Sequence, residues 1–220
     1  MNIYKPYQYN NKNMFTHIAY QPETLNITGV DITTAWRQRI EQIKKVVGVH
    51  YTKGIPFITI HLLGTKYYEE EIDTLTILIR ELARWEQWKT YQTKITIIGH
   101  WYTLPGRLVE ALKELIESTK DYETTFLNLC IAYDPRDEIV DATKNISRAV
   151  KTGKQDPEMI TQETLRENMY TPHTPPPTYI IATGGQKTLA LTPYDAPHMN
   201  IIFLDQPFES LTEEDMTKID

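Results

Sequence analysis

The sequence is poor in the residues that build disulfide frameworks and metal sites. It has 220 residues and a single cysteine, Cys130, which excludes an internal disulfide and a zinc site made of several cysteines. Its six histidines never stand two or four positions apart, the spacings at which paired histidine ligands commonly occur. These residue types alone therefore make no metal or other cofactor evident.

Basic residues are scarce relative to acidic ones. The chain has 23 lysines and arginines against 29 aspartates and glutamates, which gives a formal net charge of −6 at pH 7. Proteins that bind nucleic acid present clustered positive charge to the phosphate backbone. We therefore expect no nucleic-acid partner.

Long hydrophobic runs are absent as well. The longest are a handful of residues, such as Leu129–Tyr133 and Ile201–Leu204, whereas a membrane-spanning helix needs about 20. The first ten residues carry no apolar stretch typical of a signal peptide. We expect a cytoplasmic protein without a membrane span, which a partner could still hold at a membrane surface.

What the chain does contain is a regular alternation of two patterns. Short segments rich in β-branched residues predict strands, and apolar residues three and four positions apart predict helices between them. Strands and helices that alternate in this way favour βαβ units. The expected strands cover residues 15–20, 57–63, 94–99, 126–133, 178–183 and 200–204, and the expected helices lie around residues 40–50, 72–83, 105–116, 139–150 and 161–168.

This pattern predicts a single α/β domain over residues 14–220, with a mostly parallel sheet of about six strands and helices on both faces. Residues 1–13, rich in Asn and Tyr, are expected to form a loose N-terminal arm. Ligands of such sheets bind beyond the carboxyl ends of the strands. Chemistry is therefore expected in the loops that follow the strands, those after Tyr20, Leu63, Gly99, Tyr133 and Thr183.

Several motifs in the middle and at the end of the chain occur in a recognisable order. Ile98-Gly99-His100 and Leu104-Pro105 are followed by Asn128-Leu129 and by the block AYDPRDEIVDA from Ala132 to Ala142. Phe203-Leu204-Asp205 and Pro207-Phe208 stand near the end. In order and spacing these motifs resemble the cis-prenyltransferases, the family of undecaprenyl and dehydrodolichyl diphosphate synthases.

The resemblance implies a cis-prenyltransferase type of fold, a family that commonly dimerises, and a condensing chemistry. In this family an allylic diphosphate ionises with the help of Mg²⁺, isopentenyl diphosphate adds to it, and the product grows in a hydrophobic tunnel. That chemistry requires a carboxylate for the metal and arginines and backbone amides for the diphosphates. If the chain is active, the resemblance therefore implies Mg²⁺ as its cofactor.

Most residues at the family's catalytic positions differ here. Glu23 stands where the family has its essential aspartate, and Thr24-Leu25 replace the Gly-Asn pair that follows it. Ala182 and Thr188 replace two arginines, which a short side chain cannot imitate. The resemblance therefore implies a chain that is degenerate at its catalytic motifs and inactive alone.

The candidate site residues that the resemblance leaves are few, and each has a plain structural alternative. Glu23 is the candidate catalytic and metal-binding carboxylate, or else a solvated loop glutamate. Arg136 and Glu138, which match family positions, are candidate substrate-binding residues or part of a helix start. Thr183, Gly184 and Gly185 are candidates to cradle an anion with their amides, or a plain turn after a strand.

Three functions stay open. The first is a pseudoenzyme, a non-catalytic subunit or partner of an active cis-prenyltransferase in polyprenyl diphosphate synthesis. Such a chain would form a heterodimer with the active enzyme or a homodimer with a second copy of itself. The second is an active synthase that condenses isopentenyl diphosphate with an allylic diphosphate, with Glu23 on the metal and Arg136 or Lys187 on diphosphate. The third is a module that binds an isoprenoid or another lipid without reaction.

Overall fold

A six-stranded parallel sheet forms the centre of the molecule. The computed structural model describes residues 17–25, 30–191, 194 and 199–217. The strands lie in the order β3-β4-β2-β1-β5-β6, and every neighbouring pair is parallel. This confirms the predicted sheet. The bounds are β1 (His17–Gln21), β2 (Phe57–Leu63), β3 (Thr93–Ile98), β4 (Thr125–Ile131), β5 (Tyr179–Ala182) and β6 (Asn200–Phe203).

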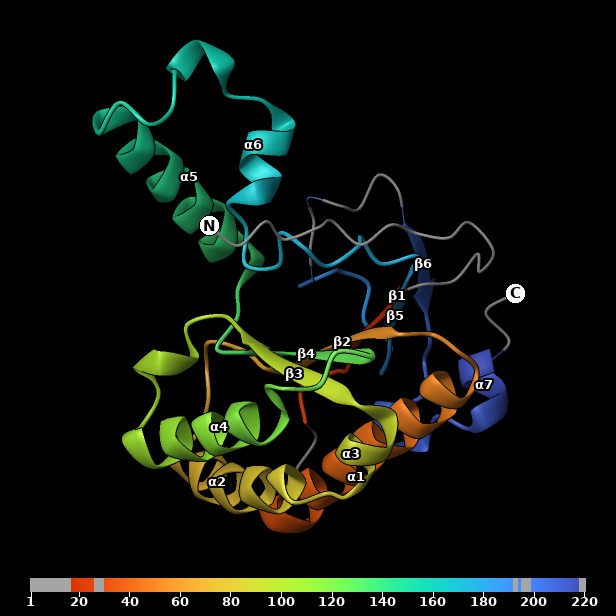
Figure 1. The fold of residues 1–220 in the computed structure, drawn as a ribbon. Helices are drawn as coiled ribbons and strands as arrows, with labels where there is room; N and C mark the ends of the chain where they lie inside the picture. Colours follow the sequence, from red (N-terminus) through yellow and green to blue (C-terminus); the bar gives the residue numbers. More distant parts are fainter. Residues whose placement is uncertain (1–16, 26–29, 192–193, 195–198, 218–220) are drawn as a thin grey trace.

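Helices cover both faces of the sheet, as predicted, but unequally. Four helices form a continuous layer on one face, whereas two lie on the opposite side and extend away from the sheet (Figure 1). The first group is α1 (Ile32–Thr52), α2 (Glu69–Ala83), α3 (Gln87–Tyr91) and α4 (Gly106–Thr119), and the second is α5 (Pro135–Lys151) and α6 (Gln162–Glu167). The C-terminal α7 (Glu213–Thr217) packs beside α1.

The main core lies between the sheet and the α1–α4 layer. Ile18, Ile58 and Ile60 of the inner strands are almost fully buried, and Ile43 and Leu112 of the facing helices are too. Parallel strands covered on both faces are expected to be apolar along their whole length, which is the pattern here. In contrast, β6 is an edge strand with exposed side chains at Ile201 and Phe203.

Helix starts extend beyond the apolar patterns that predicted them, because polar caps fix them. Asp31 caps α1 by accepting the amide of Thr34 at 3.0 Å, and Asp134 caps α5 by accepting the amide of Arg136 at 2.8 Å. Pro135 then occupies the first turn of α5, where its missing N–H costs nothing.

Some predictions lie partly or wholly outside the described residues. The N-terminal arm at 1–13 and the first two residues of the strand predicted at 15–20 belong to this part of the chain. Within the described part, no helix combines the length and the apolar character needed to cross a membrane.

Candidate functional site

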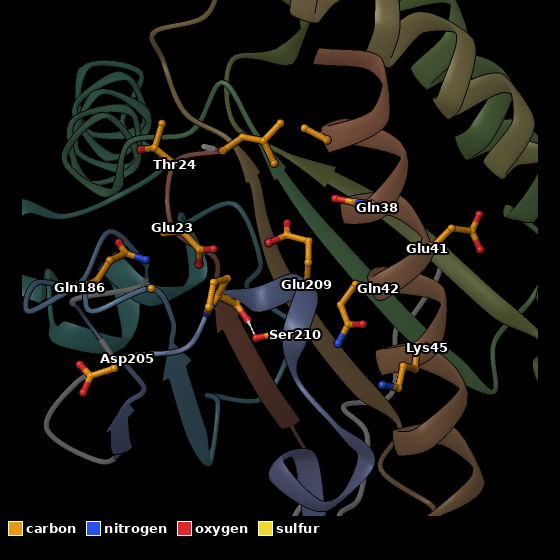
Figure 2. Close-up of a pocket in the computed structure, with 14 residues that line it drawn as sticks. Glu23, Thr24, Gln38, Glu41, Gln42, Lys45, Gln186, Asp205, Glu209 and Ser210 are labelled. Atoms are coloured by element: carbon orange, nitrogen blue, oxygen red, sulfur yellow. Dashed lines mark hydrogen bonds between the residues drawn. The ribbon is translucent and has the colours of Figure 1, made fainter. Parts of the chain in front are cut away.

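A polar groove of about 1060 Å³ lies at the carboxyl ends of β1 and β5, against one side of α1 (Figure 2). This is the edge of the sheet where the sequence predicts chemistry. The side chains of α1 form one wall, and the loops after β1, β5 and β6 form the other. The lining residues are Glu23, Thr24, Leu25, Ala35, Gln38, Glu41, Gln42, Lys45, Gly184, Gln186, Asp205, Pro207, Glu209 and Ser210.

The carboxylate of Glu23 lies at the base of this groove and has three neighbours from distant parts of the chain. The hydroxyl of Thr183 donates to its Oε2 at 2.6 Å. The amide of Phe208 donates to the same carboxylate at 3.2 Å from Oε1 and 3.3 Å from Oε2. The guanidinium Nη2 of Arg39 lies 3.8 Å from Oε1. The Glu23 carboxylate is therefore held in place on several sides.

Arg39 of α1 is a buried cation, with only 2% of its surface exposed. Its Nε donates to the carboxylate of Glu209, and its Nη1 donates to the backbone carbonyl of Glu23 at 3.1 Å. Its guanidinium carbon lies 5.5 Å from the centre of the Phe208 ring. A buried guanidinium needs partners of this kind to offset its desolvation.

The turn after β5 is packed directly onto Glu23. Gly184 has a φ of 67°, and a Cβ built on it would lie 2.6 Å from both Cβ and Cγ of Glu23. The amides of Gly184 and Gly185 donate to the carbonyls of Gln206 and Leu204 at 2.8 and 3.0 Å. The amide of Thr183 donates to the carbonyl of Gln21 at 3.1 Å. An anion bound by these three amides would have to displace backbone hydrogen bonds.

Gln21, the last residue of β1, ties the same turn to the sheet. Its Nε2 donates to Oε1 of Gln186 at 2.7 Å and to the carbonyl of Thr188 at 2.8 Å. In return, Nε2 of Gln186 donates to the carbonyl of Gln21 at 3.0 Å. This paired-amide arrangement fixes the loop after β5 without a charged residue.

Two of the predicted site residues lie elsewhere, at the start of α5. Arg136 is exposed and forms an ion pair with Asp134 at 2.5 Å, which lowers the pKa of that carboxyl. Glu138 is buried and accepts the hydroxyl of Tyr133 at 2.5 Å and the amide of Tyr170 at 2.9 Å. The structure thus brings Glu23, Thr183, Gly184 and Gly185 together, and it places Arg136 and Glu138 outside the groove lining.

A second polar cluster occupies the carboxyl end of β3. Nε2 of His100 lies 2.7 Å from Oδ2 of Asp141, and the hydroxyl of Tyr170 donates to the same oxygen at 2.7 Å. These hydrogen bonds lower the pKa of Asp141. The cluster joins the loop after β3 to α5 and to Tyr170, and so fixes the chain that follows α6.

Sequence reasoning missed Arg39, Glu209 and Gln21. Arg39 lies in an amphipathic helix that also carries the exposed Arg37, and nothing in the spacing separates the two arginines. Gln21 was detectable in principle, because it directly follows the first predicted strand at the edge where ligands bind.

The residues around Glu23 do not fit a Mg²⁺ ion. Mg²⁺ requires near-octahedral oxygen coordination. The Glu23 carboxylate instead accepts a hydroxyl and an amide and lies beside the guanidinium of Arg39, a fixed positive charge. Among the described residues, no three His, Cys, Asp or Glu side chains are placed to hold a metal ion together.

Comparisons with known proteins find the same family by sequence. A family model described as putative undecaprenyl diphosphate synthase matches residues 27–219. The tritrans,polycis-undecaprenyl-diphosphate synthase (geranylgeranyl-diphosphate specific) of Pyrococcus horikoshii is 30% identical over 187 residues, which are 81% of this chain and 71% of that protein. The human dehydrodolichyl diphosphate synthase complex subunit is 29% identical over 145 residues, 62% of this chain and 44% of that protein.

Solved structures share the fold. Lavandulyl diphosphate synthase from Lavandula x intermedia, in complex with dimethylallyl diphosphate, superposes with a TM-score of 0.84 at 21% identity and covers 93% of this chain and 92% of its own. A probable undecaprenyl diphosphate synthase from Campylobacter jejuni gives a TM-score of 0.73 at 21% identity, with 94% and 93% covered.

Proposed function

The chain belongs to the undecaprenyl diphosphate synthase family of cis-prenyltransferases, and from that premise we propose that it is a non-catalytic subunit of an active cis-prenyltransferase in polyprenyl diphosphate synthesis. The proposal includes a dimer, formed either with an active cis-prenyltransferase or with a second copy of this chain. It also includes a cytoplasmic location.

The charge of the groove carries this proposal. Of the 14 described residues that line it, four bear carboxylates (Glu23, Glu41, Asp205 and Glu209) and one bears an ammonium group, Lys45. Lys45 already donates to the carbonyl of Leu211 at 2.9 Å. Among the described residues, the guanidinium of Arg39 contacts this lining: its Nε donates to Glu209 and its Nη1 to the carbonyl of Glu23, whereas its buried Nη2 makes no hydrogen bond. Arg39 and Lys44 offset three of these carboxylates, so the groove holds few positive groups that could bind a diphosphate.

The residues at the family's diphosphate positions support the same conclusion. Ala182 is buried at the end of β5, and Thr188 lies in the loop beyond it, so neither can supply the planar fork of an arginine. The amides of the turn after β5 are hydrogen-bonded to backbone carbonyls. Arg136, the arginine kept at a family position, is paired with Asp134 outside the groove lining.

The support for a partner role comes from other members of the family and not from a contact seen in this structure. Heteromeric enzymes that this sequence resembles pair an active chain with one that lacks the first-motif aspartate. The human relative is itself named as a subunit of a complex. We infer that this chain likewise acts through a partner and contributes packing surface rather than reacting groups.

Chain elongation tests the proposal. The purified protein, given labelled isopentenyl diphosphate, farnesyl diphosphate and Mg²⁺, is expected to form no product. The protein that co-purifies with it from the native host is expected to be a cis-prenyltransferase, and its elongation rate should rise when this chain is added. Glu41→Gln, which removes a groove carboxylate at an exposed position paired with Lys44, should leave that increase unchanged.

Two results would overturn the proposal in favour of the other candidate functions. Product from the purified chain alone, lost in Glu23→Gln, would establish an active synthase. An isoprenoid or other lipid retained through purification and identified by mass spectrometry, with no prenyltransferase co-purifying, would establish a lipid-binding module.

A further inference from the structure

We propose that Glu23 is not a metal ligand but the centre of an internal clasp that fastens the C-terminal segment to the first strand, with the guanidinium of Arg39 as its permanent cation. The Glu23 clasp comprises the side chains of Glu23, Arg39, Thr183 and Glu209 and the amide of Phe208. The inference rests in part on the proposed function, because an active enzyme of this family would need that carboxylate for metal.

The clasp joins parts of the chain that are far apart in sequence. Phe208 follows Glu23 by 185 residues, and Thr183 follows it by 160. Glu209 lies 170 residues beyond Arg39. Each of these hydrogen bonds therefore links segments that are far apart in the chain.

The C-terminal segment docks along one face of α1. Arg39, Gln42 and Lys45 lie three residues apart and so share that face. Gln42 and Lys45 both donate to the carbonyl of Leu211 at 2.9 Å, and Arg39 donates to Glu209. These contacts line up residues 209–211 with the helix.

Phe208 anchors the segment below the polar contacts. Its side chain is fully buried, and its ring meets that of Tyr20 edge-on, with 5.7 Å between the centroids. Because Phe208 donates its own amide to Glu23, the carboxylate also fixes the position of this ring. The hydrophobic and the polar parts of the contact therefore depend on one another.

The contacts of the Glu23 side chain favour a clasp over a metal site. Gly184 lies against the side chain so closely that even a methyl group would meet its Cβ at 2.6 Å. The cation beside the carboxylate is the buried guanidinium of Arg39. A divalent ion at the same carboxylate would be repelled by that guanidinium and would compete with the donors from Thr183 and Phe208 for the carboxylate oxygens.

Metal binding gives the first test. Isothermal titration of the full chain with MgCl₂, alone and with inorganic diphosphate, is expected to give the same heats for the wild type and for Glu23→Gln. Stoichiometric binding in the wild type that Glu23→Gln abolishes would overturn the inference. This measurement requires no turnover.

Protection of the C-terminal segment gives the second test. Glu23→Gln is expected to increase hydrogen exchange of the amides in residues 207–217 and to lower the unfolding midpoint by about 4–8 °C. The control Glu41→Gln removes another groove carboxylate but touches no clasp residue, and it should leave this exchange unchanged. Unchanged protection in Glu23→Gln would overturn the inference.

A milder pair of variants covers the case in which Glu23→Gln does not fold. Thr183→Val removes one hydroxyl donor at nearly constant shape and should also increase exchange in residues 207–217. Thr183→Ser restores the donor and should restore protection. If the amides of residues 207–217 exchange as slowly in Thr183→Val as in the wild type, the clasp is refuted.

The clasp and the proposed function can fail separately. A chain that is inactive in elongation yet binds Mg²⁺ through Glu23 refutes the clasp and leaves the subunit proposal intact. A chain that elongates prenyl diphosphates equally well as wild type and as Glu23→Gln refutes the subunit proposal and leaves the clasp intact.

Discussion

Two buried histidines should make the stability of this protein fall steeply below neutral pH. His17 lies in β1, where its Nδ1 donates to the carbonyl of Pro175 at 2.6 Å and its Nε2 lies 2.8 Å from Oγ1 of Thr59. Asn128 donates to that same Oγ1 at 3.2 Å, so the Thr59 hydroxyl has its own proton to give to Nε2. This network suits a neutral imidazole, with Nδ1 as the donor and Nε2 as the acceptor.

His50 of α1 is in a comparable position. It is fully buried, and its Nε2 lies 2.5 Å from the hydroxyl of Tyr20. Burial, together with a smaller effect of the positive charges of Arg166 on His17 and of Lys53 on His50, lowers the pKa of both histidines to about 4. The unfolded chain keeps the ordinary histidine pKa of about 6.5.

The sign and size of the effect follow from proton linkage. Between pH 6.5 and pH 4 the unfolded chain binds protons that the folded chain refuses, so acidification favours unfolding. For a folded pKa of about 4, each histidine removes roughly 2 kcal/mol of stability between pH 7 and pH 5. Most carboxylates titrate below this window in both states, so they contribute little to the change.

Urea denaturation at pH 7 and at pH 5 measures this difference. We expect the wild type to lose about 4 kcal/mol between the two values. His17→Gln should reduce the loss by about 2 kcal/mol, whatever its effect at pH 7. A wild-type stability that is flat from pH 7 to pH 5, or a loss in His17→Gln equal to that of the wild type, would refute the reasoning.

Three further substitutions test the fold around the site by the same urea assay. Gly99→Ala should lower the free energy of unfolding by at least about 3 kcal/mol, because Gly99 has a φ of 109° and a Cβ there would lie 2.5 Å from the carbonyl oxygen of Ile131. The control Gly106→Ala should not lower it, because a Cβ at Gly106 has no atom within 4 Å. Asp134→Ala should cost about 1 kcal/mol by removing the cap of α5, whereas Arg136→Ala should leave the urea midpoint unchanged. Phe208→Ala should cost about 3–5 kcal/mol, and a loss below 1 kcal/mol would mean that the C-terminal segment adds little to the core.

The strands were predictable because their composition is unambiguous. The expected segment 57–63 coincides with β2, and the segments at 94–99 and 126–133 differ from β3 and β4 by one or two residues at their ends. In β2 and β4 β-branched and other apolar residues form a run that is largely buried, whereas the edge strand β3 alternates buried residues with the half-buried Lys94 and the exposed Thr96. Helices α3 and α7 were not predicted, because five residues are too few to establish a helical period.

The site was predictable only in part, for a related reason. The rule that ligands bind at the carboxyl ends of strands indicated the loops after Tyr20 and Thr183, and the resemblance to the cis-prenyltransferases singled out Glu23 and residues 183–185 within them. The partners of Glu23 were not predictable, since Arg39 is one of two arginines in α1 and Glu209 is 170 residues away. Contacts across that separation depend on the final packing rather than on any local pattern.

If this chain is the non-catalytic subunit proposed above, its fold explains how the chemistry is lost while the structure is kept. The main core lies mostly between the sheet and the α1–α4 layer, and from the loops at the carboxyl edge it includes Leu104, Ala132, Phe208 and Leu211. Polar groups at that edge still need partners once the family's arginines are replaced, because an unpaired buried carboxylate is costly. Here Thr183, Arg39 and the amide of Phe208 fill that need for Glu23. On this argument, the double variant Ala182→Arg, Thr188→Arg should not catalyse chain elongation, because Glu23 would stay held in the clasp. Elongation by this double variant, with Glu23 unchanged, would show instead that the missing arginines alone account for the loss of activity.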